Sequence, residues 1–113
     1  MKRSLKNFLR DILKYAIIIQ KQTINLSFEE FEENKERILS VMMAFTIIGE
    51  ASKNIPDEFR CLYPQIEWRK MIEIGDKIIH EYSEVNLTVL WNTSQENIPN
   101  LIVKMQRIIA DLE

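Results

Sequence analysis

Residues 34–56 read NKERILSVMMAFTIIGEASKNIP, and this stretch carries a long helical pattern that ends at a proline. Apolar side chains recur in it three and four residues apart, which is the spacing of one face of an α-helix. Pro56 disfavours the helical conformation of the residue before it, so the helix should end there. The stretch therefore predicts a long amphipathic helix over about residues 34–54. Its inward stripe consists of Ile38, Val41, Met42, Phe45, Ile48 and Ser52.

Similar patterns on either side predict further helices joined by short links. We expect a long helix over about residues 4–22 and a short helix that begins at the Ser27-x-x-Glu30 capping box. A helical turn is expected over residues 57–62, and a further helix over about residues 68–82. Asn86 can cap a last helix that runs to the C-terminus, and Pro99 should kink or divide that helix. The chain has only 2 glycines and 3 prolines, which favours long helices over a turn-rich sheet. These features predict an all-α fold, an antiparallel four-helix bundle with short additional helices, in one domain over residues 1–113.

Composition and charge argue against several classes of protein. The net charge of −2 does not indicate the basic stripe of a duplex-binding protein, although a compact RNA contact is compatible with it. Cys61 is the only cysteine, so no internal disulfide can form, and a reducing compartment is expected. The basic start, Met1–Lys6, is not followed by a signal peptide's apolar run, because Arg10, Asp11 and Lys14 interrupt it. We expect a cytoplasmic protein with no membrane span.

His80, the one histidine of the chain, falls on the charged face of its predicted helix. Asp76, one turn earlier, could orient the imidazole, and Lys77 could hold a phosphate. An imidazole can give or take a proton near neutral pH, so this face is the candidate chemical site. The remaining charged members of the His80 face are Arg69 and Glu73, whereas the opposite stripe, expected to face the core, consists of Trp68, Ile72, Gly75, Ile79 and Tyr82.

Spacing by itself favours a less specific interpretation of the same residues. A single histidine on a charged helical face is most often only solvated, and Asp76 and Lys77 are then solubilising charges. Tyr82 is then a core tyrosine at a helix end. The sequence contains no Gly-rich phosphate loop, no cluster of Cys and His, and no spacing of a Ser-His-Asp triad. It therefore predicts neither a cofactor nor a metal site.

Four further polar residues and two tryptophans have competing interpretations. Glu50 and Lys53 could form a surface pair or an interhelix salt bridge, or contact RNA. Arg69 and Lys70 could line an RNA path, although Arg69 could instead pair with a glutamate one turn on. The two tryptophans, Trp68 and Trp91, are expected in the core.

Several separate segments of the chain resemble the HepT-like proteins of the HEPN class. They follow one another in order over nearly the whole chain, so the resemblance is specific. It implies a helical bundle that forms a homodimer and acts as a metal-independent RNase toxin, with tRNA as its substrate. It also implies a protein partner, a minimal nucleotidyltransferase that serves as the antitoxin. The matching segments are Ile47–Pro56, Phe59-Arg60, Tyr63-Pro64, Trp68–Lys70, Ile78–Tyr82, Val85–Leu87 and Trp91.

The active-site motif of that family is an Arg, four residues, a His, any residue and a Tyr. His80 and Tyr82 match the last two positions, and Asp76 matches the polar residue that commonly follows the Arg. In the family the antitoxin transfers AMP to the motif tyrosine, so the resemblance implies AMPylation of Tyr82. The position of the motif Arg is occupied by Gly75. A guanidinium there would bind the scissile phosphate and stabilise the charge of the transition state.

The sequence is compatible with three explanations for the glycine at the position of the motif arginine. The protein is a natural member of weakened or absent activity, or Lys77 or Arg69 supplies the cation, or the glycine is a deliberate inactivating substitution. A lysine would supply a charge without the bidentate fork of an arginine.

The working hypothesis is RNA cleavage by His80 acting as general base or acid, with two protomers contributing to one cleft. One rival is a non-catalytic partner that docks the nucleotidyltransferase through its His80–Tyr82 edge. Another is a structural homodimer without chemistry.

Overall fold

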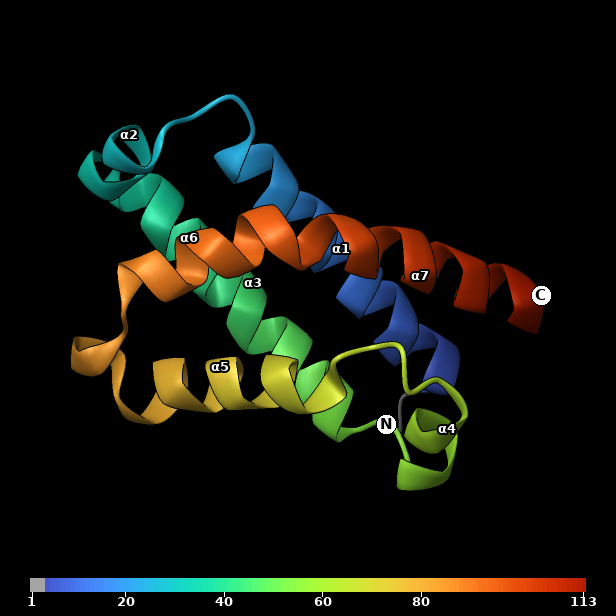
Figure 1. Cartoon of the computed structure of the whole chain (residues 1–113). Coiled ribbons are helices and arrows are strands. Elements are labelled where there is room, and N and C mark those ends of the chain that lie inside the picture. Colours follow the sequence, from blue (N-terminus) through green and yellow to red (C-terminus); the bar gives the residue numbers. More distant parts are fainter. Residues whose placement is uncertain (1–3) are drawn as a thin grey trace.

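The computed structural model describes residues 4–113, and within that range it contains helices and no strand (Figure 1). Met1–Arg3, the first half of the basic start noted above, lies outside the described residues. The all-α prediction is confirmed. The elements are α1 (Leu5–Thr23), α2 (Phe28–Glu33), α3 (Lys35–Lys53), α4 (Asp57–Leu62), α5 (Trp68–His80), the 3₁₀ turn η1 (Tyr82–Glu84), α6 (Leu87–Glu96) and α7 (Ile98–Leu112).

The helix ends follow the local signals in the sequence. Ser27 and Glu30 form the predicted capping box, with Glu30 N–H donating to Ser27 Oγ at 3.1 Å and Ser27 N–H donating to Glu30 Oε1 at 2.9 Å. That second hydrogen bond is the main reason why the pKa of Glu30 lies below its ordinary value. Asn86 caps α6 by accepting from two backbone N–H groups. The predicted last helix is divided at Asn97, and Pro99 occupies the first turn of α7, where a missing N–H is tolerated.

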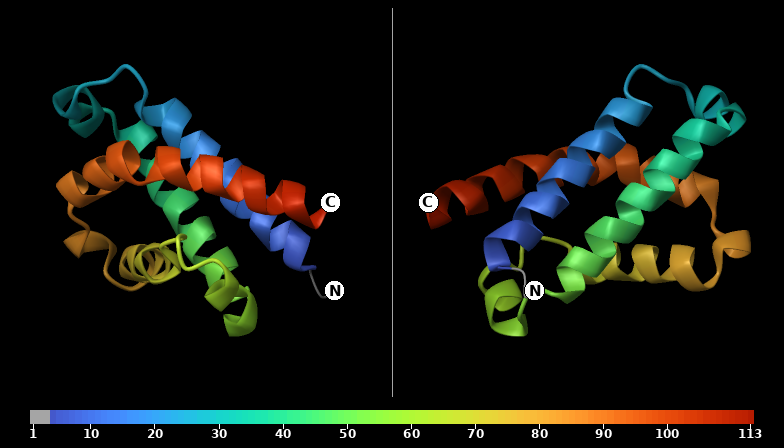
Figure 2. Two further views of the ribbon diagram at one scale, coloured as in Figure 1. Left: turned by 45° about the vertical axis from the view of Figure 1, so that its right-hand side comes forward. Right: turned by 180° about the vertical axis from the view of Figure 1, so that it is seen from behind.

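Helix α3 lies at the centre of the molecule. It runs antiparallel to α1, while α5 packs against α3 and α7 packs across α1 (Figures 1 and 2). Because α3 is covered by both α1 and α5, it buries more than one stripe of side chains. Of the predicted stripe, Ile38 and Met42 are only partly buried. The fully or nearly fully buried residues of α3 are Val41, Ala44, Phe45, Ile48, Gly49, Ala51 and Ser52.

The two tryptophans differ in their burial. Trp68 is buried at the start of α5, and its indole N–H donates to the carbonyl of Tyr63 at 3.1 Å. Trp91 is only partly buried, and its ring lies 6.1 Å from that of Phe28 and 5.3 Å from that of Phe31. Trp68 is therefore the core residue that was predicted, whereas Trp91 covers one end of the core. None of the helices between residues 4 and 113 has the length and apolarity that a bilayer crossing needs.

Candidate functional site

His80 and Tyr82 lie together at the exposed C-terminal end of α5. Helix α5 stops at His80 because Glu81 leaves the helical conformation, with φ −141° and ψ 47°. Tyr82 consequently begins η1, and 76% of its surface is exposed. The prediction that Ile79 and Tyr82 face the core is wrong, since Ile79 is also 44% exposed. The prediction for Tyr82 assumed that the helical spacing of α5 continues to residue 82, but the helix ends at His80.

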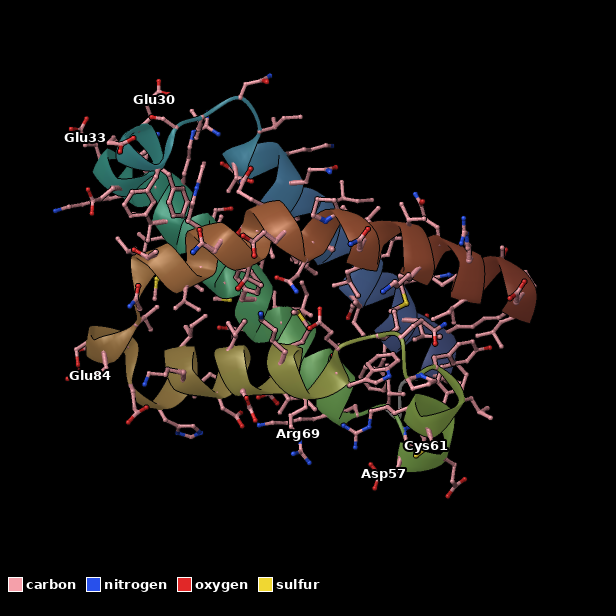
Figure 3. The ribbon with its side chains drawn as sticks, in the orientation of Figure 1. Glu30, Glu33, Asp57, Cys61, Arg69 and Glu84 are labelled. Atoms are coloured by element: carbon pink, nitrogen blue, oxygen red, sulfur yellow. The ribbon has the colours of Figure 1, made fainter. Side chains whose placement is uncertain are left out.

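The charged face of α5 is present as predicted, and His80 belongs to it. Arg69, Glu73 and Lys77 are all exposed, and Figure 3 shows the Arg69 side chain pointing away from the helices. Lys77 Nζ lies 3.5 Å from a carboxylate oxygen of Glu81. No ion pair joins Arg69 to Glu73 in the part of the chain that the structure describes. Arg69 therefore remains available to a ligand on this face.

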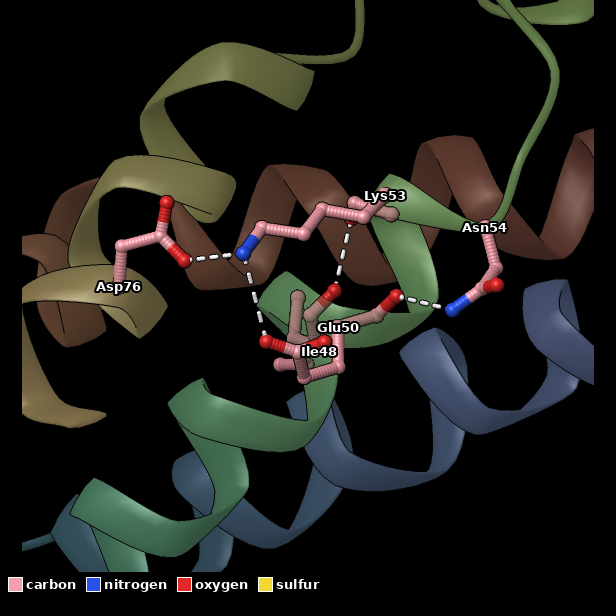
Figure 4. A network of polar contacts seen from close by, with 6 residues as sticks. Ile48, Glu50, Lys53, Asn54 and Asp76 are labelled. Carbon is pink, nitrogen blue, oxygen red and sulfur yellow. Dashed lines mark hydrogen bonds and ion pairs between the residues drawn. The ribbon is translucent and has the colours of Figure 1, made fainter.

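Asp76 is held by Lys53 of α3 and not by His80 (Figure 4). The Lys53 ammonium donates to Asp76 Oδ1 and, at 3.4 Å, to Glu50 Oε1. Glu50 and Lys53 form the surface pair that was considered, within α3, and Lys53 also forms an interhelix salt bridge with Asp76 of α5. Among residues 4–113, no hydrogen bond links Asp76 to His80. Lys53 and Asp76 are 23 residues apart, so no local pattern indicates their contact.

The ion pair also determines what Lys53 can do. The hydrogen bond to Asp76 is the main cause that raises the pKa of Lys53 above its ordinary 10.5, and the charge of Glu50 adds to this. Lys53 is therefore fully charged at neutral pH. Two carboxylates already balance the charge of Lys53. The residue is therefore better suited to hold α3 and α5 in contact than to bind a phosphate.

Lys53→Met should lower the thermal midpoint more than Lys77→Met does. Lys53 joins two helices through two carboxylates, whereas Lys77 makes one long contact within its own segment. The pKa of Lys53 is higher in the folded state than in the unfolded state. The stabilisation of the fold by the charged Lys53 is therefore complete below the unfolded-state pKa of about 10.5 and is lost as pH rises through the folded-state pKa.

Urea unfolding between pH 7 and 11 measures this dependence. The difference in unfolding free energy between wild type and Lys53→Met should stay constant up to about pH 10 and shrink above it. A difference that already shrinks between pH 7 and 9 would contradict the assignment.

Gly75, at the position of the motif Arg, lies at the crossing of α3 and α5. It faces Gly49 of α3, and these are the two glycines of the chain. A Cβ built on Gly75 would lie 3.2 Å from Gly49 Cα and 3.3 Å from the carbonyl oxygen of Phe45, closer than ordinary van der Waals contact. Position 75 therefore faces a neighbouring backbone, and any side chain there requires the two helices to shift by a few tenths of an ångström.

The three remaining candidate cations of α5 do not form one cluster. Lys70 is partly buried, Lys77 lies on the exposed face one turn before His80, and Arg69 lies on the same face about three turns before His80. Residues 4–113 hold no group of three His, Cys, Asp or Glu side chains placed to bind a metal ion. The arrangement can support proton transfer by His80 and attraction of an anion by Lys77 or Arg69.

Comparison with known proteins identifies relatives over nearly the whole chain. The family model described as "Ribonuclease HepT-like" matches residues 12–108. A protein of Thermococcus cleftensis named "Probable ribonuclease HepT" is 44% identical over 108 residues, which cover 96% of this chain and 98% of that protein. A Methanocaldococcus jannaschii protein named as a candidate RNase is 36% identical over 112 residues, 99% of this chain and 93% of its own length.

More distant relatives have names of the same kind. A Caldanaerobacter subterraneus protein, also named as a candidate RNase, is 32% identical over 102 residues, covering 90% of this chain and 91% of that protein. No solved structure gives a significant match.

Proposed function

This chain belongs to the HepT-like ribonuclease family, and from that premise we propose that it is the toxin of a toxin–antitoxin pair. It acts in the cytoplasm as a metal-independent endoribonuclease, with tRNA as its substrate, and a minimal nucleotidyltransferase is its antitoxin. The observation that carries the proposal is the exposed pair His80 and Tyr82 at the end of α5. A long substrate can reach both side chains without any movement of the core.

In the proposed reaction His80 removes the proton from a ribose 2′-hydroxyl. The 2′-oxygen attacks the adjacent phosphorus, the bond to the 5′-oxygen breaks, and a 2′,3′-cyclic phosphate forms. The 5′-oxygen takes a proton from an imidazolium, for which we propose the partner subunit's His80 in a homodimer. General acid–base catalysis of this kind contributes about 10²–10⁴-fold to a rate.

Lys77 is the cation best suited to hold the scissile phosphate. It lies one turn before His80 on the same face of α5. Its pair with Glu81 is long and exposed, and such pairs contribute at most about 1 kcal/mol, so Lys77 can exchange Glu81 for a phosphate. Lys53 is balanced by two carboxylates, and Gly75 has no side chain. Arg69 is the second choice, because it lies further along the exposed face.

The metal-independent mechanism predicts that a tRNA pool is cut in the presence of EDTA. The products should end in 2′,3′-cyclic phosphate, which mass spectrometry of the fragments detects. Cleavage that EDTA abolishes, or products without the cyclic phosphate, would contradict this mechanism.

Tyr82 is the proposed site at which the antitoxin silences the toxin. The phenol oxygen attacks the α-phosphorus of ATP, pyrophosphate leaves, and the phenol proton passes to a base. Its exposure of 76% makes the hydroxyl accessible to a second protein. With antitoxin and ATP, intact mass should increase by one or more AMP units in wild type and in Tyr63→Phe, which alters a partly buried tyrosine. The increase should be absent in Tyr82→Phe.

One observation favours a second function, that of a non-catalytic partner of the nucleotidyltransferase. The motif position 75 carries no side chain and faces α3, so no guanidinium is present there. A chain that co-purifies with the nucleotidyltransferase but never cuts RNA would have this second function.

A further inference from the structure

A groove of about 320 Å³ lies alongside the His80–Tyr82 segment, between α5 and the start of α6. Small-ligand sites in proteins typically begin at about 300 Å³. The chain that connects the two walls of the groove is the segment that carries His80 and Tyr82. The walls are mainly aliphatic and are formed by Ile74 and Ile78 of α5 and by Val85, Val89 and Leu90 on the other side.

Two polar side chains with donor groups line the same groove. Lys77 lies three residues before His80, so its ammonium can reach both the groove and the space beside the imidazole. Asn86 uses its side-chain oxygen to cap α6, at 2.8 and 3.2 Å from two backbone N–H groups, which leaves its NH₂ group as a donor. Glu84 also borders the groove, but Figure 3 shows its carboxylate pointing outward.

We propose that this groove binds a nucleobase of the RNA strand, next to the bond that His80 cleaves. The proposal rests on the proposed RNase function and names the part of the substrate that is recognised. The two apolar faces of a base fit between aliphatic walls, and an acceptor on its edge can receive the N–H of Asn86. The phosphate of the same nucleotide then lies within reach of Lys77, so the groove complements both the shape and the charge of a nucleotide.

The position of the groove supports a base over another apolar ligand. Single-stranded RNA is recognised through unstacked bases that are held on protein surfaces while the backbone runs past them. A strand whose scissile phosphate lies at His80 can place a neighbouring base in the groove, because Lys77 borders the groove and lies three residues before His80. Val89 is 47% exposed, and a bound base would cover it.

Binding can be tested without any cleavage, with nucleoside 5′-monophosphates as probes. In NMR titrations of the labelled full chain, the methyl signals of Ile78, Val85 and Val89 should shift, with a dissociation constant of about 1 mM or weaker. Val89→Trp should fill the groove and abolish the shifts of the Ile78 and Val85 signals. The matched control is Val103→Trp, since Val103 on α7 is 46% exposed and lies away from the groove. It should leave the shifts unchanged.

Cleavage-site mapping provides the second readout. Val89→Trp should change the preference for the base next to the cleaved bond by about tenfold, a difference of about 1.4 kcal/mol, while Val103→Trp keeps the wild-type pattern. Unmoved groove signals, or an unchanged base preference in Val89→Trp, would overturn the proposal. So would a groove variant that weakens only the binding of the nucleotidyltransferase. Nucleotide binding in the groove by a chain that never cuts RNA would support the groove and refute the RNase function.

Discussion

His80→Ala should lower the rate of RNA cleavage by about 10²–10⁴-fold, the range that loss of a general acid or base produces. His80 is the single histidine of the chain, so no second imidazole of the same protomer can replace it. It is exposed at the last position of α5 and lies outside the core. The substitution should therefore change the rate of cleavage without changing the fold.

The matched control is Gln106→Ala, a truncation at an exposed position of α7. Both variants should have the thermal midpoint of the wild type within about 2 °C, since exposed positions tolerate truncation. Initial rates on a tRNA pool in EDTA then compare the three proteins. Equal rates for His80→Ala and wild type would mean that the cleavage, if any, comes from another group or from a contaminant.

Gly49→Val should destabilise the protein by up to about 3 kcal/mol through overpacking of the α3–α5 crossing. A Cβ on Gly49 would lie 3.0 Å from the carbonyl oxygen of Met71 and 3.1 Å from Gly75 Cα. Both are backbone atoms, so they cannot rotate away, and α5 must move as a whole. Gly49→Ala should be less harmful, because alanine gains about 1 kcal/mol of helix propensity over glycine.

Urea unfolding measures these differences, with Ala110→Val as the control. Ala110 is exposed on α7, so its substitution places a valine in a helix without a crossing to disturb. A loss of about 3 kcal/mol corresponds to roughly 12 °C in thermal midpoint for a domain of this size. A Gly49→Val protein as stable as Ala110→Val would show that the close approach of the two helices does not matter.

The same contact governs any attempt to restore the motif arginine. Gly75→Arg adds a cation and at the same time forces α3 and α5 apart, since its Cβ meets the backbone of α3. Gly75→Ala adds a Cβ without a charge, so it measures the separation of α3 and α5 alone. Because both variants can be partly unfolded, their cleavage rates have to be compared at equal folded fraction. Cleavage that rises in Gly75→Arg alone would assign the missing cation to position 75, and unchanged cleavage in both would reject that explanation.

Local patterns in the sequence were sufficient to predict the helices and most of their ends. The Ser27–Glu30 capping box, the cap at Asn86 and the division near Pro99 all appear where the sequence predicts them. Each depends on contacts between residues at most four apart, and such contacts are visible in the order of residues. The exposed charged face that includes His80 was predictable for the same reason, because helical periodicity determines which side chains share a face.

Contacts between residues of different helices could not be predicted from the sequence and depend on how the helices pack. The pairing of Lys53 with Asp76 and the contact of Gly49 with Gly75 both depend on how α5 crosses α3. A crossing results from the packing of whole helix surfaces, and no single segment encodes it. The exposure of Tyr82 likewise depends on the end of α5 at His80, because helical periodicity does not predict the orientation of residues beyond the helix. The sequence pattern thus located the candidate site. The packing of the helices determined which of its charged side chains, such as Asp76, are already paired.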